Sequence, residues 1–80
     1  MEYAMKMRAG DKIICECGQV AGGFRRDVEK AERITSEDIQ MDLDTCRVEN
    51  GAYQCLRCSK EMARIANRSW TVRTAKGWVT

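Results

Sequence analysis

The stretch CRVENGAYQCLRC, residues 46–58, contains the strongest turn signal of the chain and one of its two close cysteine pairs. Asn50-Gly51 favours a two-residue type I′ turn, because both central residues of that turn need a positive φ. A turn at this position places Cys46 directly opposite Cys55, on the same face of a hairpin. The sequence therefore predicts a β-hairpin over residues 46–55 that ends at the cysteine pair.

The other close pair, Cys15 and Cys17, is separated from this one by 37 intervening residues. Zinc prefers four soft ligands in a tetrahedron, with each sulfur about 2.3 Å from the metal. Two cysteine pairs from separate parts of a chain fill all four positions and leave none open, which is typical of a structural site. We therefore predict a structural Zn²⁺ site with four ligands: Cys15, Cys17, Cys55 and Cys58.

The fifth cysteine, Cys46, has three possible roles. It can pack as a buried thiol beside the site, since its predicted partner in the hairpin is the ligand Cys55. It can also replace Cys15 or Cys17 as a ligand, because a pair with one intervening residue makes a tighter chelate than the common pair with two. The third possibility is a redox partner for Cys55.

The segment after the second pair has the pattern of a helix. Residues 59–68 contain neither Gly nor Pro, and Met62, Ile65 and Ala66 follow the i, i+3, i+4 spacing of an apolar helix face. We expect a short α-helix here, with Cys58 at its N-terminus, where the positive end of the helix dipole favours a thiolate.

This order of a cysteine turn, a β-hairpin and a helix resembles treble-clef and zinc-ribbon-like four-cysteine zinc fingers, with a further likeness to the zinc-finger end of DksA/TraR-type transcription regulators. The resemblance spans about residues 15–68 and implies a structural metal and a regulatory binding role. Two features depart from these families: the first pair is C-x-C rather than C-x-x-C, and the chain has no room for a coiled coil. The residues that carry the resemblance are Cys15, Cys17, Gly18, Cys55 and Cys58.

The fold expected from these patterns is a small, β-rich α+β domain, a treble-clef-like zinc finger with β-hairpins and one short α-helix. A length of 80 residues corresponds to a single domain, residues 1–80. A core of this size rarely stabilises a fold by more than about 3–5 kcal/mol, so a metal is a common additional support. Alternating or apolar patterns predict further strands at residues 3–8, 12–15, 24–28 and 39–44, and a hairpin formed by residues 70–74 and 78–79.

Positive charge is concentrated at the C-terminal end. Residues 57–80 contain six Lys or Arg and one Glu, whereas residues 1–56 have a net charge of −3. On the expected helix most of these basic residues form one stripe, which could follow a phosphate backbone, while tryptophan could stack on bases. The alternative is that the basic residues offset the zinc–thiolate charge and the tryptophans pack in a core. The candidate nucleic-acid or partner-binding residues are Arg57, Lys60, Arg64, Arg68, Trp70, Arg73 and Lys76.

Composition limits the class of function. The chain has no histidine, which excludes Ser-His and Cys-His catalysis and histidine-based metalloprotease motifs. No segment has the pattern of a signal peptide or a membrane span, so we expect a cytoplasmic protein without a membrane partner. The carboxylates of residues 29–44 match no metal-binding loop, and we expect them on a solvated loop and strand face.

The sequence thus predicts a small intracellular binding module with a structural zinc and no enzymatic activity. DNA or RNA is the first partner to consider, and a protein such as a component of the transcription machinery is the second. A thiol redox protein that uses Cys55 and Cys58 is the remaining alternative, and an iron–sulfur centre fits the cysteine spacing less well. No small-molecule substrate is expected.

Overall fold

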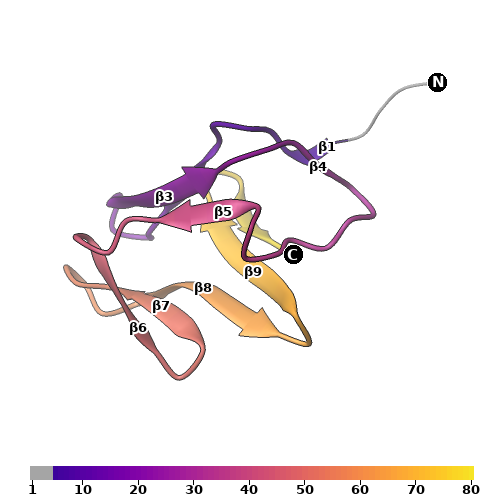
Figure 1. The fold of residues 1–80 in the computed structure, drawn as a ribbon. Helices are drawn as coiled ribbons and strands as arrows, with labels where there is room; N and C mark the ends of the chain where they lie inside the picture. The colour runs from indigo at the N-terminus through magenta and orange to yellow at the C-terminus, as the bar shows by residue number, and fades with distance from the viewer. Residues whose placement is uncertain (1–4) are drawn as a thin grey trace.

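The protein is all-β in a computed structural model that describes residues 5–80 (Figure 1). Tyr3, expected in the first strand, lies outside the described residues. Within residues 5–80 there are ten strands: β1 (Met5–Met7), β2 (Lys12–Ile14), β3 (Val20–Phe24), β4 (Val28–Glu29), β5 (Ile39–Met41), β6 (Cys46–Glu49), β7 (Ala52–Cys55), β8 (Glu61–Ala66), β9 (Ser69–Thr74) and β10 (Gly77–Val79). These residues form no helix, so none of them provides a helical membrane span.

Eight of the described strands form one antiparallel sheet in the order β5-β3-β2-β9-β8-β7-β6, with β10 also paired to β9, while β1 and β4 form a separate two-stranded sheet. In Figure 1 the large sheet is strongly curled, with β3 and β5 crossing above the fan of β6, β7 and β8. Strand β9 therefore connects an N-terminal half, β2, β3 and β5, with a C-terminal half, β6 to β8.

The two halves meet end to end along one edge of β9. Val72 is paired with both β8 and β10, and Thr74 is paired with both β2 and β10. A strand has two edges, so β10 occupies one of them while β2 and β8 share the other. Since β2 and β8 both run antiparallel to β9, the end of β2 points toward the beginning of β8. We call this junction the seam.

The expected α-helix over residues 59–68 is not formed, and the α+β and treble-clef predictions are therefore wrong. The segment instead contains β8 and the two-residue turn that leads to β9, in which Asn67 and Arg68 have φ values of 52° and 64°. An irregularity in the pairing of β7 with β8 lets the adjacent Met62 and Ala63 both be fully buried. Of the three residues of the expected helix face, only Met62 is buried, since Ile65 and Ala66 are exposed.

Another strand was placed incorrectly by the sequence pattern. Residues 24–28 were expected to form a strand, but β3 ends at Phe24 and contains Gly22 and Gly23. At Gly22 a Cβ atom would lie 2.3 Å from the carbonyl oxygen of Gln40 in β5. The glycine thus permits a close approach of two strands, rather than a bend between them.

The hairpins predicted from turn signals are confirmed. Strands β6 and β7 pair in the expected register around Asn50-Gly51, with Cys46 opposite Cys55. Strands β9 and β10 form the expected C-terminal hairpin. Strand β1 lies in the middle of the pattern at residues 3–8, and β2 and β5 form the first three residues of the patterns at 12–15 and 39–44.

The core lies on one face of the curled sheet. Cross-strand partners share a face, and the paired residues Ala63 and Val72 are both fully buried. Ile13, whose partner is Thr74, is also fully buried, and Phe24 is buried with its partner Ile39. The same face thus continues across the seam from one half to the other.

The loop between β4 and β5 packs under this core. The indole N–H of Trp70 donates to Ser36 Oγ at 2.9 Å. Asp38 is 1% exposed, accepts the Thr35 backbone N–H at 2.8 Å and pairs with Arg26. Burial raises the pKa of Asp38, but the hydrogen bond from Thr35 and the guanidinium of Arg26 lower it more. Asp38 is therefore a buried structural anion, whereas the sequence predicted a solvated one.

Candidate metal centre

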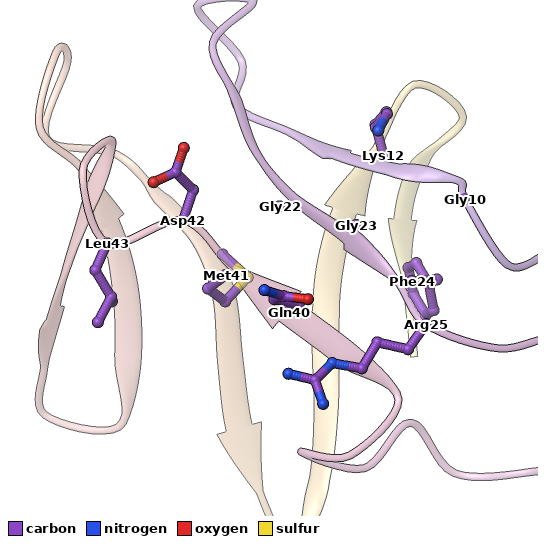
Figure 2. Close-up of a pocket in the computed structure, with 10 residues that line it drawn as sticks. All are labelled: Gly10, Lys12, Gly22, Gly23, Phe24, Arg25, Gln40, Met41, Asp42 and Leu43. Carbon is purple, nitrogen blue, oxygen red and sulfur yellow. The ribbon is translucent and has the colours of Figure 1, made fainter.

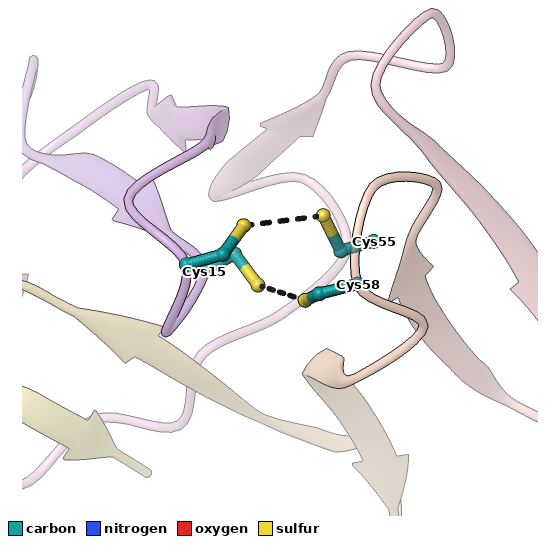
Figure 3. Close-up of side chains that lie close together, drawn as sticks. Cys15, Cys55 and Cys58 are labelled. Carbon is teal, nitrogen blue, oxygen red and sulfur yellow. Dashed lines mark hydrogen bonds between the residues drawn. The ribbon is translucent and has the colours of Figure 1, made fainter.

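Two turns bring the four predicted ligands together at the seam. The first cysteine turn, residues 15–18, follows β2 and leads to β3, and the second, residues 55–58, leads from β7 toward β8. Figure 3 shows the sulfur atoms of the labelled Cys15, Cys55 and Cys58 pointing into the space between these turns. The turns come from the two halves of the sheet, so the centre spans their junction.

The distances between the sulfur atoms fit one small ion. Sγ of Cys15 lies 3.2 Å from Sγ of Cys58, Sγ of Cys17 lies 3.7 Å from Sγ of Cys55, and the four sulfurs lie within 4.8 Å of one another. A tetrahedron with metal–sulfur bonds of about 2.3 Å has sulfur–sulfur distances of about 3.8 Å. All four cysteines are free thiols. This group can hold a metal ion.

The two cysteine turns have matching backbones, although the first pair is one residue closer in sequence. In each turn the residue after the second cysteine has a positive φ, 92° at Gly18 and 65° at Ser59. The Gly18 N–H donates to the carbonyl oxygen of Cys15, and the Ser59 N–H donates to that of Cys55, both at 2.8 Å. Each turn is thus closed by a backbone hydrogen bond to the carbonyl of its first cysteine, from the third residue after it in the C-x-C turn and from the fourth in the C-x-x-C turn.

Backbone amides and burial set the electrostatics of the centre. Burial raises the pKa of the Cys15 thiol to about 12. Burial also acts to raise the pKa of Cys55, but the backbone N–H groups of Cys58 and Arg57 and two neighbouring thiols lower it to about 7. The Arg57 N–H lies 3.3 Å from Sγ of Cys55. Backbone donors directed at a sulfur are the usual second-shell support of a thiolate ligand.

Cys46 lies beside the centre but outside the group of four. Its backbone is paired with Cys55, as the turn register predicted, and its side chain is 2% exposed. The Cys46 thiol donates to the carbonyl oxygen of Asp42 at 3.1 Å, and burial raises its pKa. The geometry is that of a packed thiol next to the ligands.

Three of the predicted basic binding residues have partners within the fold. Lys60, two residues after the second cysteine turn, forms an exposed ion pair with Glu16 of the first turn at 3.1 Å. Arg64 pairs with Glu61 at 2.6 Å. The guanidinium of Arg73 donates to the carbonyl oxygen at the end of β2 at 3.1 Å, across the seam. These contacts use the basic side chains to hold the sheet and its turns.

The other predicted binding residues do not form one surface. Arg57 is exposed in the second cysteine turn, Lys76 in the β9–β10 turn, and Arg68 at the opposite end of β8. Trp70 is only 7% exposed, and its ring centroid lies 5.5 Å from that of Tyr53. The stripe expected on a helix is therefore replaced by separate charges, and the Trp70 ring is part of the core.

Two hollows in the surface were not predicted. One, of about 570 Å³, lies over β3 and β5 next to Gly22 and Gly23, with Lys12, Arg25 and Asp42 among its lining residues (Figure 2). The other, of about 360 Å³, lies beside the metal centre and is lined by Gln19, Asp44, Thr45, Leu56 and Arg57. The second hollow depends on the contact between the cysteine turns and the β5–β6 link, which no local sequence signal reveals.

Comparisons with family models, with curated proteins and with solved structures each found no match for this chain.

Proposed function

We propose that the protein is a binding module whose fold is held by one structural Zn²⁺ ion, bound by Cys15, Cys17, Cys55 and Cys58. The observation that supports this most directly is the convergence of four thiols from two matching turns. Soft thiolates in a tetrahedral set select zinc or iron, whereas hard cations such as Mg²⁺ and Ca²⁺ prefer oxygen ligands. A set of four protein ligands leaves no position for substrate, so the metal has a structural role.

A protein partner is favoured over nucleic acid. Leu56, in the second cysteine turn, is 54% exposed and lines the hollow beside the metal centre. The hydrogen bond from the Leu56 N–H to the Thr45 carbonyl, at 3.1 Å, holds this turn against the β5–β6 link, whose Leu43 is 66% exposed. An exposed leucine at the edge of a hollow offers the kind of apolar contact that a protein partner uses.

The metal is tested by elemental analysis of freshly purified protein. One equivalent of zinc per chain is expected, together with thiolate charge-transfer bands after Co²⁺ substitution and a large loss of stability on addition of a strong chelator. One equivalent of iron would replace zinc in the proposal but leave its structural role. Reversible oxidation of Cys55 and Cys58 at cellular potentials in a metal-free, folded protein would contradict it and favour a redox function.

The partner class is tested with two matched variants. Leu56→Asp places a charge beside the metal centre, whereas Trp78→Asp changes an apolar side chain of similar exposure, 52%, on β10. Partner proteins captured by the wild-type chain should be lost with Leu56→Asp and kept with Trp78→Asp. Strongly salt-dependent retardation of DNA or RNA, weakened by reversing the charge of Arg57 and Lys76, would instead show a nucleic-acid partner.

A further inference from the structure

Strand β6 forms one end of the large sheet, and none of the residues 5–80 pairs with its outer edge. In Figure 1 it lies at the border of the fan formed by β6, β7 and β8. An edge strand presents backbone N–H and C=O groups that can pair with another strand. The edge of β6 is therefore a possible site for addition of a strand.

The turn next to β6 determines which residue presents these groups. In a two-residue hairpin the residues that flank the turn, Glu49 and Ala52, form a hydrogen-bonded pair. Hydrogen-bonded and non-hydrogen-bonded pairs alternate along an antiparallel ladder. Val48 and Tyr53 are thus a non-hydrogen-bonded pair, and the N–H and C=O of Val48 point outward from the edge.

The side chains around Val48 are complementary to themselves. Arg47, Val48 and Glu49 are all exposed, with Val48 at 59%. When two copies of this segment pair antiparallel with a two-fold axis at Val48, each Arg47 lies opposite Glu49 of the other copy. Parallel pairing in register would instead place like charges opposite each other, which is unfavourable.

We propose that β6 is a self-association surface, through which two copies of this chain pair their β6 strands antiparallel about Val48. The two Val48 residues exchange their outward N–H and C=O groups, and their side chains meet on one face. On the other face Arg47 and Glu49 of both copies form a cluster of four alternating charges. Within each chain Arg47 lies 3.7 Å from Glu49 and also donates to Gln54 Oε1 on β7, so its guanidinium must turn toward the outer edge when the second copy binds.

The opposite end of the sheet is less suited to the same pairing. At the edge strand β5, Ile39 is buried, Met41 is partly buried and Gln40 carries no charge. Pairing about Gln40 would add no charge complementarity. The observations therefore favour β6 and a second copy of this chain as its occupant.

Charge exchange tests the proposal most sharply. An edge-to-edge contact is smaller than a standard interface, so the wild-type chain should dimerise weakly, with dimers detected by sedimentation equilibrium at up to about 1 mM. Arg47→Glu or Glu49→Arg alone puts like charges opposite each other twice, and each should weaken association by about tenfold. The double exchange, Arg47→Glu with Glu49→Arg, restores both pairs and should restore the dimer.

A proline variant tests the backbone contact. Val48→Pro removes an N–H that the β6–β7 ladder does not use, and edge strands accept proline in that position. This variant should keep the metal content of the wild type while remaining a monomer. The proposal is overturned if the wild type stays monomeric at about 1 mM, if the single charge variants associate as well as the wild type, or if the double exchange does not recover association. Metal analysis of each variant separates these outcomes from failure of the zinc centre.

Discussion

Cys17 and Cys46 are chemically identical side chains with opposite surroundings. Cys17 is exposed, and its sulfur is one of the four that converge, whereas Cys46 is buried and bonded to the Asp42 carbonyl. Packing and metal binding are therefore separated between these two residues. Substitution of each by alanine distinguishes the two contributions.

Cys17→Ala should lower metal affinity by more than about 100-fold. Changes to residues that only support the ligands typically lower metal affinity by about 10–100-fold, and the loss of a ligand should have a larger effect. Without metal, its stability should equal that of the wild type, since the side chain makes little buried contact. Cys46→Ala should keep one equivalent of metal and lose about 1 kcal/mol with or without it. Metal titration and urea unfolding, with and without chelator, measure both effects. Loss of metal from Cys46→Ala would make Cys46 a ligand.

The residues that could be predicted at this scale are those whose chemistry alone requires a partner. Two thiol pairs are unusual enough to indicate a metal at any separation in sequence. Asp38 has no such signal: it lies in a run of carboxylates, and only the fold places Arg26 and the Thr35 N–H around it. Trp70 likewise was assigned two possible environments, and the packing of the β4–β5 loop selects the core.

At the scale of elements, two similar turns differed in how well the sequence revealed them. Asn50-Gly51 and Asn67-Arg68 both have two consecutive positive φ values. Glycine adopts such values without cost, so the first turn could be predicted. Arginine rarely does, and the second turn was hidden within an apparent helix. The helix propensity of residues 59–68 is overcome by the pairing of β8 with strands on both sides.

The strained turn gives a prediction for stability. Arg68 has a positive φ of 64°, and Arg68→Gly removes the strain of this left-handed conformation. Part of this gain is offset by the greater freedom of glycine in the unfolded chain, so the variant should be more stable by about 0.5–1 kcal/mol. Arg68→Ala keeps the strain and should give no gain. Urea unfolding of the metal-bound proteins measures the difference. Equal stability of the two variants would show that the turn relaxes without cost.

Close packing of β3 against β5 gives a second prediction for an element. A Cβ at Gly22 would lie 2.3 Å from the backbone oxygen of Gln40, whereas one at Gly23 would lie 3.3 Å from that of Asp11. Gly22→Ala should therefore force the strands apart and cost about 1–3 kcal/mol, in the range of overpacked cores. Gly23→Ala, a matched neighbour, should cost clearly less. Thermal unfolding of both variants compares them, and an equal loss would contradict a specific contact of Gly22 with β5.

For the whole molecule, the metal centre explains how one sheet is assembled from two halves. Strands β2 and β9 are joined in the register by the single pair of Ile13 with Thr74, whereas β8 and β9 share four pairs. At the seam the Arg73 guanidinium also joins β9 to the end of β2 by its contact to the Ile14 carbonyl. A metal bound to both cysteine turns would fasten the seam at the point where the backbone pairing is sparse.

Removal of the metal should consequently open the molecule in a definite order. Amide hydrogens of β2 and β3 should exchange faster at once on addition of chelator, while those shared by β8 and β9 should stay protected longest. Hydrogen exchange followed by mass spectrometry measures the order. Simultaneous loss of protection in all strands would show that the metal supports the entire sheet rather than the seam.

A variant of Arg73 tests whether the metal and the guanidinium act on the same junction. Arg73→Ala removes a contact across the seam without touching a ligand, and with the metal bound the centre should still hold the two halves together. Its cost should therefore be small in the metal-bound protein, about 0.5 kcal/mol. After chelation it should be larger, about 1.5–3 kcal/mol, the range for a hydrogen bond that involves a charged group. If Arg73 and the metal supported different regions, the stability lost by Arg73→Ala and by chelation would add up. Non-additive losses in urea unfolding would thus show that both act at the seam, and that the seam is the weakest part of the metal-free fold.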